Sequence, residues 1–205
     1  MLILSWNLLM RAGAGTEDIC RLVDTHRPDL VLLQEATTAI DRLPELLGGQ
    51  YVRRAMPGRS HGLAAWSESP FTTETVSLPA AGRLDIPVPI FRSIAPRIAL
   101  VVRIPGVDIA NVHLDHGQWA NRRQLRHLLV SCPGIGMVIG DYNALGTTTL
   151  PGFSDVGPRR PTHTAYGVIP VRLDRCLSRG GQVARSTALA RGNSDHRPIL
   201  VGFAA

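Results

Sequence analysis

Short apolar runs that end in polar residues or glycine recur along the chain and alternate with segments of helical periodicity. Leu2–Leu4, Leu30–Leu33 and Met137–Ile139 each hold three or four apolar residues, a pattern typical of buried strands. Between the first two runs, apolar residues recur every three or four positions, which predicts a helix over residues 17–27 that ends before Pro28. A strand, a helix and a second strand in this order indicate an α/β domain.

The same pattern extends over the rest of the chain. It predicts two more helices, a weaker one over residues 37–47 and a basic one over Trp119–Val130. Further strands are predicted at Tyr51–Ala55, Gly62–Trp66, Phe91–Ile94, Arg97–Ile104, Val107–Leu114, Val171–Leu177, Gln182–Ala190 and Ile199–Phe203. Residues 79–90 are predicted as a loop, and the Gly-, Pro- and Arg-rich stretch 146–170 as irregular. Because no repeat or linker divides the chain, we expect residues 1–205 to form one domain.

Composition narrows the class of protein. The chain is 44% hydrophobic, which is ordinary for a soluble globular protein. No apolar run reaches the length of about 18 residues that crossing a membrane requires. Its 3 cysteines lack the spacing of a metal site and favour reduced thiols. We therefore expect a cytoplasmic monomer that does not contact membranes.

The charge of the chain is carried by an unusual choice of residues. All 22 basic residues are Arg, and the net charge is +6. The guanidinium group matches phosphate geometry, so this balance favours DNA, RNA or a phosphorylated small molecule as partner. A genome-wide coding bias toward Arg would produce the same composition. The charge therefore leaves the class of partner open.

Polar side chains stand at the ends of the predicted strands and near them. They are Asn7, Glu35, His113, Asp141, Asn143, Asp174, Asp195 and His196. If the strands that end in Asn7 and Glu35 are parallel neighbours, both side chains emerge at one edge of a sheet. The set is rich in carboxylate and amide oxygen and contains no Cys, so it favours Mg²⁺ or Mn²⁺ over zinc. His61 and His163 lie in predicted loops that could also reach a substrate.

The stretch Gly140-Asp141-Tyr142-Asn143 carries the most specific chemistry. It follows a predicted buried strand, and we expect Gly140 to allow a tight turn at the end of that strand. Asp141 and Asn143 are two positions apart, so in an extended chain their side chains point the same way. A carboxylate there can orient and deprotonate a water, and an amide can donate to a phosphoryl oxygen. A polar turn after a core strand is the alternative interpretation.

The other polar positions also have purely structural interpretations. Asn7 could cap a strand, Glu35 could be a solvated turn residue, and His113 could be a half-buried histidine with satisfied hydrogen bonds. Asp174 could form an ion pair with one of the two Arg residues that flank it, Arg172 or Arg175. Taken singly, each of these positions is compatible with a structural role.

Six short motifs spread over nearly the whole chain in a fixed order. They are Ser5-Trp6-Asn7, Leu33-Gln34-Glu35, Asn111-Val112-His113-Leu114, Gly140-Asp141-Tyr142-Asn143, Arg172-Leu173-Asp174 and Ser194-Asp195-His196-Arg197-Pro198. In wording and order they resemble the endonuclease/exonuclease/phosphatase superfamily, which includes AP endonucleases, DNase-type nucleases, deadenylases, inositol-phosphate phosphatases and sphingomyelinases. The resemblance implies a four-layer α/β sandwich, in which two mixed β-sheets pack face to face with helices outside.

The resemblance also implies a role for each polar position. Glu35 would be the main metal ligand, with Asn7 beside it and Asp195 near the metal. Asp141 would orient or deprotonate the attacking water, and Asn143 would hold the phosphate and the water. Phosphoryl transfer needs these functions, because it requires an activated water in line and neutralisation of the phosphate charge.

Three further roles follow from the same resemblance. His196 would contact the phosphoryl oxygen and stabilise the transition state. Asp174 would accept a hydrogen bond from His196 and fix its tautomer, as carboxylates do for histidines in many sites. His113 matches the histidine that DNase-like members use near the leaving group.

The chain departs from the family pattern in places. Glu68 stands in Ser67-Glu68-Ser69-Pro70 where the family often has Arg, and Asn7-Leu8 replaces the Asn-Gly that is common in AP endonucleases. At 205 residues the chain is also short for the family, so long substrate-recognition insertions are missing. These departures argue against AP-site specificity and leave the hydrolytic centre complete.

We therefore expect a Mg²⁺- or Mn²⁺-dependent phosphoesterase that hydrolyses a phosphodiester bond in nucleic acid by in-line attack of an activated water. A phosphatase or phosphodiesterase acting on a small molecule or lipid is the alternative within the same reaction class. A catalytically inactive binding protein with the same fold is less favoured, because every catalytic position holds a competent residue.

Overall fold

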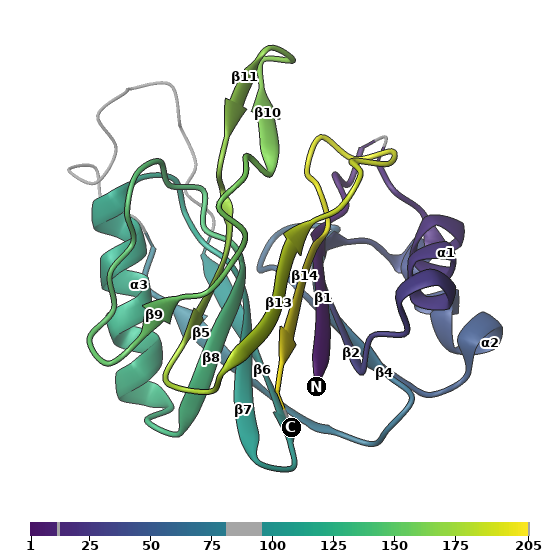
Figure 1. Ribbon diagram of the computed structural model, residues 1–205, viewed down its shortest axis with the longest axis horizontal. Helices are drawn as coiled ribbons and strands as arrows, with labels where there is room; N and C mark the ends of the chain where they lie inside the picture. Colours follow the sequence, from purple (N-terminus) through teal and green to yellow (C-terminus); the bar gives the residue numbers. More distant parts are fainter. Residues whose placement is uncertain (12, 81–95, 205) are drawn as a thin grey trace.

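Two β-sheets of six strands each pack face to face, and helices cover their outer faces (Figure 1). The computed structural model describes residues 1–11, 13–80 and 96–204. Each sheet contains one parallel strand pair among antiparallel ones. The four-layer α/β sandwich with two mixed sheets that the sequence predicted is thereby confirmed.

The first sheet joins strands from the two ends of the chain. Its strands are β1 (Leu2–Asn7), β2 (Leu30–Ala36), β3 (Gln50–Ala55), β4 (Gly62–Ser67), β13 (Val183–Ala188) and β14 (Ile199–Phe203). They lie in the order β13-β14-β1-β2-β4-β3. β1 and β2 are parallel, and Asn7 is in register with Gln34. Asn7 and Glu35 therefore stand at the same edge of this sheet, as predicted.

The second sheet is built from the middle of the chain. Its strands are β5 (Thr72–Leu78), β6 (Arg97–Ile104), β7 (Val107–His113), β8 (Ile135–Asp141), β9 (Ser154–Asp155) and β12 (Asp174–Ser178). They lie in the order β5-β6-β7-β8-β12-β9, with β7 and β8 parallel. A separate hairpin of β10 (His163–Ala165) and β11 (Ile169–Val171) rises beyond the sheets at the top of Figure 1.

The helices connect the parallel strands and cover the sheets. α1 (Thr16–His26) leads from β1 to β2, and α3 (Gln118–Ser131) leads from β7 to β8. The 3₁₀ helix Thr38–Arg42 and α2 (Leu43–Leu47) follow β2 on the side of the first sheet where α1 lies, whereas α3 lies on the opposite side of the molecule (Figure 1). Within the described residues, no helix combines the length and apolar composition that crossing a membrane requires.

Alternate residues of one apolar run enter different layers of the core. Leu30 and Leu32 pack between the two sheets, whereas Val31 and Leu33 pack under α1. This division follows from the period of two in a strand, which sends successive side chains to opposite faces. The run Leu30–Leu33 is continuous because both faces of β2 are buried.

Some predicted elements have different bounds in the structure. The helix predicted over 37–47 is divided into the 3₁₀ helix and α2, and Pro44, which lacks a backbone N–H, stands in the first turn of α2. Strand β5 was not predicted, because it is largely exposed and lacks a long apolar run. The strand predicted at Val171–Leu177 begins only at Asp174. The predicted strand Phe91–Ile94 lies outside the described residues.

Gly140 has a different role from the predicted one. It lies within β8 and not in a turn after it. Its φ is 140°, and a Cβ at this position would lie 2.1 Å from the carbonyl oxygen of Val112 on β7. Glycine is therefore required because the backbones of β7 and β8 approach closely at this point.

Candidate active site

Strand ends from both sheets meet at one edge of the sandwich. β7 and β8 end in register at His113 and Asp141. β12 runs in the opposite direction, so its first residue, Asp174, pairs with Asp141. From the first sheet, β1 ends at Asn7, and His196 precedes β14. Side chains that are far apart in the sequence are thereby brought together.

The carboxylate of Asp141 is the centre of this arrangement and is 1% exposed. Its Oδ2 accepts a hydrogen bond from Asn7 Nδ2 at 2.9 Å, and its Oδ1 accepts one from the backbone N–H of Asn143 at 2.9 Å. Oδ2 also lies 3.5 Å from His113 Nε2 and 3.8 Å from His196 Nε2. Burial opposes ionisation of this carboxyl, but the charge of His196 and the two hydrogen bonds hold the pKa of Asp141 below its ordinary value.

The ring of His196 is fixed by Asp174. The Nδ1 atom of His196 lies 2.8 Å from Asp174 Oδ2, and both side chains are buried. This is the hydrogen bond that the resemblance implied. The alternative, an ion pair of Asp174 with a flanking Arg, is wrong, because Arg172 and Arg175 both bind Asp155 instead.

The charge of His196 follows from these neighbours. Burial alone would lower its pKa, but the negative charges of Asp174 and Asp141 outweigh burial and raise the pKa of His196 to about 10. The ring is therefore protonated at neutral pH. With Nδ1 bonded to Asp174, its Nε2–H is directed to the side of Asp141. The arrangement presents a positively charged donor beside an ionised carboxylate.

His113 occupies the other side of Asp141 and has a different electrostatic setting. Its Nε2 lies 3.5 Å from Asp141 Oδ2 and 4.0 Å from Glu35 Oε1. Burial and the charge of Arg97 lower the pKa of His113 well below its ordinary value, so this ring is neutral. Its Nδ1 is buried and has no hydrogen-bond partner among the described residues.

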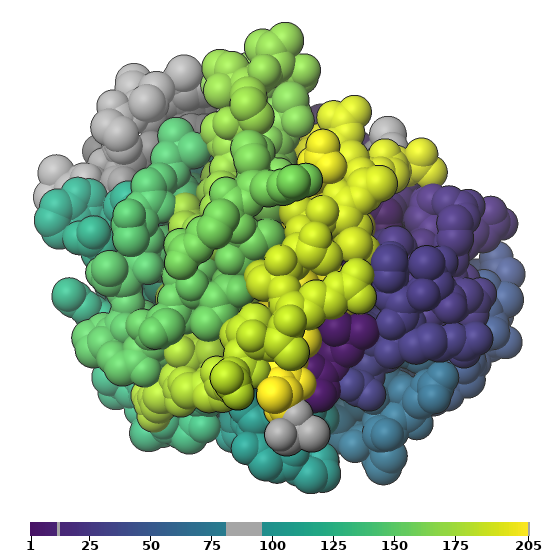
Figure 2. All heavy atoms as spheres, viewed as in Figure 1, coloured from purple at the N-terminus to yellow at the C-terminus, as the bar shows by residue number. Residues whose placement is uncertain are grey.

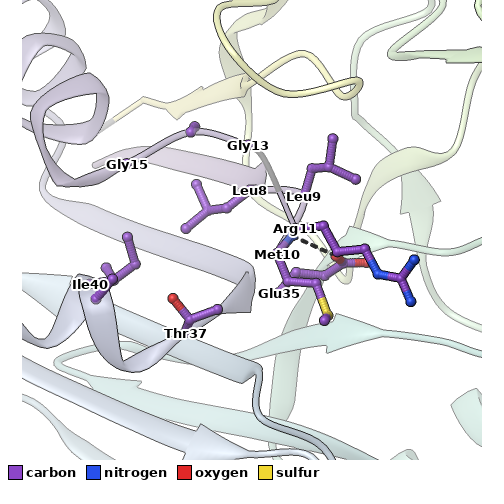
Figure 3. A pocket seen from close by; sticks show the side chains of 11 residues that line it. Leu8, Leu9, Met10, Arg11, Gly13, Gly15, Glu35, Thr37 and Ile40 are labelled. Carbon is purple, nitrogen blue, oxygen red and sulfur yellow. Dashed lines mark hydrogen bonds between the residues drawn. The ribbon is translucent and has the colours of Figure 1, made fainter.

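Glu35 stands at a β-bulge of β2, where the register with β4 shifts between Gln34 and Ala36. Its φ is 55°, a left-handed conformation that is costly for a residue with a side chain. Its Oε2 accepts a hydrogen bond from the backbone N–H of Met10 at 3.0 Å. Figure 3 shows Glu35 beside Met10 and Arg11 in a pocket of about 240 Å³. The bulge thus directs this carboxylate out of the sheet toward the site.

The structure offers oxygen donors that suit a hard cation. Oε1 of Glu35 accepts no hydrogen bond from the described residues, and Oδ1 of Asn7 accepts only one, from the backbone N–H of Leu9 at 3.1 Å. Mg²⁺ typically binds one or two carboxylates and leaves its other positions to water and phosphate. The donor chemistry at Glu35 therefore fits the predicted cation.

Asp195 lies in a different cluster from Glu35. Its Oδ2 is 3.8 Å from His163 Nδ1, and carboxylate and ring atoms of His163, Asp195 and His196 could together reach one metal ion. A second such cluster contains Asp141, Asp174 and His196. In that cluster the His196 nitrogen is engaged by Asp174 at 2.8 Å, so a hydrogen-bonded relay explains the closeness of the groups better than a metal site does.

Asn143 approaches Asp141 in a way that the sequence did not predict. Its φ is 48°, so the chain turns after Asp141 and is not extended there. The side chain of Asn143 donates from Nδ2 to the carbonyl oxygen of Leu114 at 3.1 Å, while its backbone N–H binds Asp141. The Asp141 carboxylate therefore meets the backbone of Asn143 through this left-handed turn, and strand alternation does not align the two side chains.

Motif residues without an assigned role form a buried network between the two sheets. Gln34 donates from Nε2 to Ser5 Oγ at 3.0 Å and to Asn111 Oδ1 at 2.7 Å. Asn111 donates from Nδ2 to the carbonyl oxygens of Leu33 and Ala64 at 3.0 Å each. Because buried amides are costly unless they are bonded, this network fixes how the sheet carrying Glu35 sits against the sheet carrying Asp141.

The structure adds polar residues that the motifs did not single out. Arg97, at the start of β6, is buried and donates from Nε to Asp115 at 2.9 Å, leaving its Nη1 without a partner among the described residues. His61 is also buried, and neither of its ring nitrogens is bonded within those residues. In the sequence, the only sign that Arg97 belongs to the site was its position as the first residue of a predicted buried strand.

Comparison with known proteins places this geometry in a family. The sequence profile of the Endonuclease/Exonuclease/phosphatase family matches residues 4–196. No curated protein sequence matches the chain. An endonuclease/exonuclease/phosphatase from Bacteroides vulgatus superposes with a TM-score of 0.74 at 16% identity, covering 98% of this chain and 97% of that chain.

Two other solved structures have similar folds. The mannosyl-6-phosphatase Bt3783 of Bacteroides thetaiotaomicron has a TM-score of 0.72 at 18% identity, with 100% of both chains covered. TDP2 of D. rerio, solved with a single-strand DNA product, has a TM-score of 0.68 at 18% identity, with 100% of this chain and 99% of that chain covered. At these identities the likeness shows a shared fold.

The match of the family profile covers five of the six motifs in full and the sixth as far as His196. It begins before Asn7 and ends at His196, so it includes the polar positions of both sheets. The two-sheet architecture and the site at its edge agree with that match. The chain therefore belongs to the endonuclease/exonuclease/phosphatase family, whose named activities all hydrolyse phosphoester bonds.

Proposed function

We propose that this protein hydrolyses a phosphodiester bond in nucleic acid, using a divalent cation bound at Glu35. One observation carries the proposal. A buried carboxylate, Asp141, is held ionised by Asn7 between a protonated His196 and a neutral His113. Phosphoryl transfer needs a base, a positive donor and a group beside the leaving oxygen, and these three side chains provide them.

Asp141 is proposed to orient and deprotonate the attacking water. Its Oδ1 and Oδ2 each accept one fixed hydrogen bond, from Asn143 and from Asn7, so the direction of the carboxylate is set before substrate binds. Its lowered pKa keeps it ionised at neutral pH. A preorganised acceptor costs little reorganisation during the reaction, which is how such groups lower the barrier.

His196 is proposed to donate from Nε2–H to a phosphoryl oxygen. Asp174 holds the ring through Nδ1 at 2.8 Å and keeps the proton on the nitrogen that faces the site. The positive ring then neutralises charge that accumulates on the phosphate in the transition state. His113 is proposed to act beside the leaving oxygen, and Asn143 to hold the phosphate.

Glu35 and Asn7 are proposed to hold Mg²⁺ or Mn²⁺, and Asp195, which belongs to the neighbouring cluster, is proposed to lie near the ion. Glu35 supplies a carboxylate oxygen without a hydrogen bond from the described residues, and Asn7 supplies an amide oxygen with spare capacity. When bound, such a cation neutralises phosphate charge and polarises the phosphoryl group. The left-handed conformation of Glu35 is then explained, because strain at a functional site is maintained by what the site does.

A screen of substrates with and without metal tests this function. Plasmid DNA, single-stranded RNA, abasic DNA and bis-p-nitrophenyl phosphate are incubated with the protein in Mg²⁺, in Mn²⁺ and in EDTA. Metal-dependent hydrolysis of a nucleic acid together with bis-p-nitrophenyl phosphate supports the proposal. Activity in none of them, or full activity in EDTA, contradicts it.

A small phosphorylated molecule is the second candidate substrate. The chain aligns over its whole length with the whole length of the mannosyl-6-phosphatase Bt3783, so the fold is shared from end to end with a phosphatase of a small molecule. In addition, the Arg residues of α3 act locally: Arg122 lies over the ring of Trp119, and Arg123 donates to the carbonyl oxygen of Ala80. Inositol phosphates and hexose phosphates in the same screen distinguish this candidate, which requires their turnover to exceed that of nucleic acid.

A further inference from the structure

A cavity of about 200 Å³ lies on the His196 side of the candidate active site. Arg160, His163 and Arg197 line it together with two prolines and two small residues. None of the six motifs accounts for this cavity, although Arg197 belongs to the last of them. Its volume holds several water molecules, and so also the five heavy atoms of a phosphate group.

His163 is a wall shared by the cavity and the active site. Its backbone forms an isolated β-bridge with His196, and the centroids of the two rings are 4.3 Å apart. The Nδ1 atom of His163 is buried and has no hydrogen-bond partner among the described residues. One imidazole ring therefore separates the cavity from the histidine that is proposed to bind the scissile phosphate.

The polar groups of the cavity are donors with unused capacity. Arg197 donates from Nη1 to the carbonyl oxygen of Leu189 at 3.2 Å, and a guanidinium has five N–H groups. Arg160 has no hydrogen bond or ion pair with the described residues, unlike its neighbour Arg159, which donates to the carbonyl oxygen of Asp155 at 3.1 Å.

No carboxylate is among the described residues that line the cavity. The Oδ2 atom of Asp195 lies 3.8 Å from His163 Nδ1, but Asp195 does not line the cavity. Two guanidinium groups and an imidazole that line one cavity suit an anion, because Arg forks match phosphate oxygens in pairs. Figure 2 shows that this region is at the surface, where the hairpin of β10 and β11 stands next to the segment that leads into β14.

We propose that this cavity binds a second phosphate group of the substrate, one imidazole ring away from the phosphate that is hydrolysed. The proposal rests on the proposed function and specifies its substrate class as a molecule with at least two phosphates. Such a molecule is either a nucleic-acid strand, which carries a phosphate at every nucleotide, or a small bisphosphate. The chemistry recognised in the cavity is the same for both.

Equilibrium binding tests the cavity without relying on turnover. Fluorescein-labelled tetrathymidylate is titrated, over a series of salt concentrations, against protein that carries Asp141→Asn. The same background carries Arg160→Gln with Arg197→Gln as the test and Arg159→Gln as the matched control. Arg159 is adjacent in sequence and equally cationic, but it does not line the cavity. Circular dichroism confirms that all variants are folded.

The double variant should weaken binding roughly tenfold, because it removes charge-assisted hydrogen bonds to one phosphate. The slope of log Kd against log salt should fall by about 0.7, the value for one phosphate contact on a single strand. The Arg159→Gln control should keep both values. Unchanged binding in the double variant, or equal weakening in the control, would overturn the proposal.

Competition then separates the two sources of the second phosphate. Fructose 1,6-bisphosphate and fructose 6-phosphate are used to displace the labelled strand from the Asp141→Asn protein. Stronger displacement by the bisphosphate, reduced in the double variant, identifies a small bisphosphate as sufficient. Displacement by neither sugar identifies the strand as the source. Turnover of bis-p-nitrophenyl phosphate by the unmodified protein independently tests the proposed function, so failure of the two proposals is distinguishable.

Discussion

The two histidines that flank Asp141 differ in how completely their rings are bonded. On the His196 side, Nδ1 of the ring is bonded to Asp174 and its backbone N–H to Ser194 Oγ at 3.1 Å. On the His113 side, within the described residues, Nδ1 of His113 and both ring nitrogens of His61 are buried without a hydrogen-bond partner. Both sides are equally inaccessible, so burial does not explain the difference.

The difference indicates which of the two rings is fixed before substrate binds. On the His196 side, Oδ1 of Asp174 and Nδ1 of His163 are also buried without a partner among the described residues, but they do not hold the His196 ring. A buried donor without a partner costs about 1–3 kcal/mol, so a fold retains such donors where they serve another purpose. The His196 side is a preorganised relay whose loss should affect stability and catalysis together. The His113 side holds ring nitrogens without partners, and their loss should affect catalysis without loss of stability. The predictions below test that contrast.

Removal of metal should have the largest effect. We expect EDTA to abolish phosphodiester hydrolysis and Mg²⁺ or Mn²⁺ to restore it, because a bound cation neutralises phosphate charge. Glu35→Gln should raise the metal concentration needed for half activity and lower kcat, measured with bis-p-nitrophenyl phosphate. Glu68→Gln, an exposed site outside the motifs, is the control. Undiminished hydrolysis in chelator would remove the metal from the mechanism.

Substitution of Asp141 or His196 should have the second-largest effect on the rate of hydrolysis. Asp141→Asn and His196→Ala should each lower kcat by roughly 10²-fold or more, since one loses the base and the other the positive donor. Steady-state kinetics at saturating metal measures both, with circular dichroism as the check on folding. A variant that turns over like the unmodified protein would refute the role of its residue.

Asp174→Asn should affect catalysis and stability together. We expect kcat to fall and Tm to drop by a few degrees, because a buried charged hydrogen bond is lost. Removal of this negative charge lowers the pKa of His196, so the alkaline limb of the pH–rate profile should move to lower pH. Asp155→Asn, which loses a half-buried ion pair away from His196, should lower Tm but leave that limb in place. Equal pH profiles for the two variants would contradict the relay.

His61→Leu should separate catalysis from stability. Replacing an unbonded buried imidazole by an apolar side chain should leave Tm unchanged or raise it. If His61 donates to the substrate, kcat/KM should fall by about fivefold, the equivalent of one hydrogen bond of about 1 kcal/mol. Thermal unfolding and steady-state kinetics measure the pair of values. A lower Tm with normal kcat/KM would mean that His61 stabilises the fold and does not serve catalysis, which would contradict the contrast between the two sides of Asp141.

Charge reversal on α3 should have the smallest effect. Arg122 lies over the ring of Trp119, and Arg123 donates to the carbonyl oxygen of Ala80. The double variant Arg122→Glu with Arg123→Glu should therefore change the Kd for tetrathymidylate by less than about twofold at 0.15 M salt. At this ionic strength exposed charges are screened. The salt series described for the cavity measures this directly. A loss as large as that of the Arg160 and Arg197 double variant would move the phosphate-binding surface to this helix.

The sequence by itself determined most of the long buried strands and the identity of the polar groups at their ends. Arg97–Ile104 and Ile199–Phe203 have the predicted bounds, and β1 and β2 are parallel as expected. These features are local. A strand can be recognised from an apolar run and the residues that flank it, and a short motif can be recognised from its own residues, whatever the rest of the chain does. The Asp174–His196 hydrogen bond was reached through the motifs' resemblance to a family.

Only the tertiary structure decided which polar groups meet and which are left unbonded. Asn7 and Asp141 are 134 positions apart and come into contact because two sheets pack face to face. That packing also buries His61 and Arg97, requires glycine at position 140, and places His163 against His196 beside a cavity. Hydrophobic periodicity indicates which face of a strand is buried, but it does not indicate which residues of the opposite sheet contact that face.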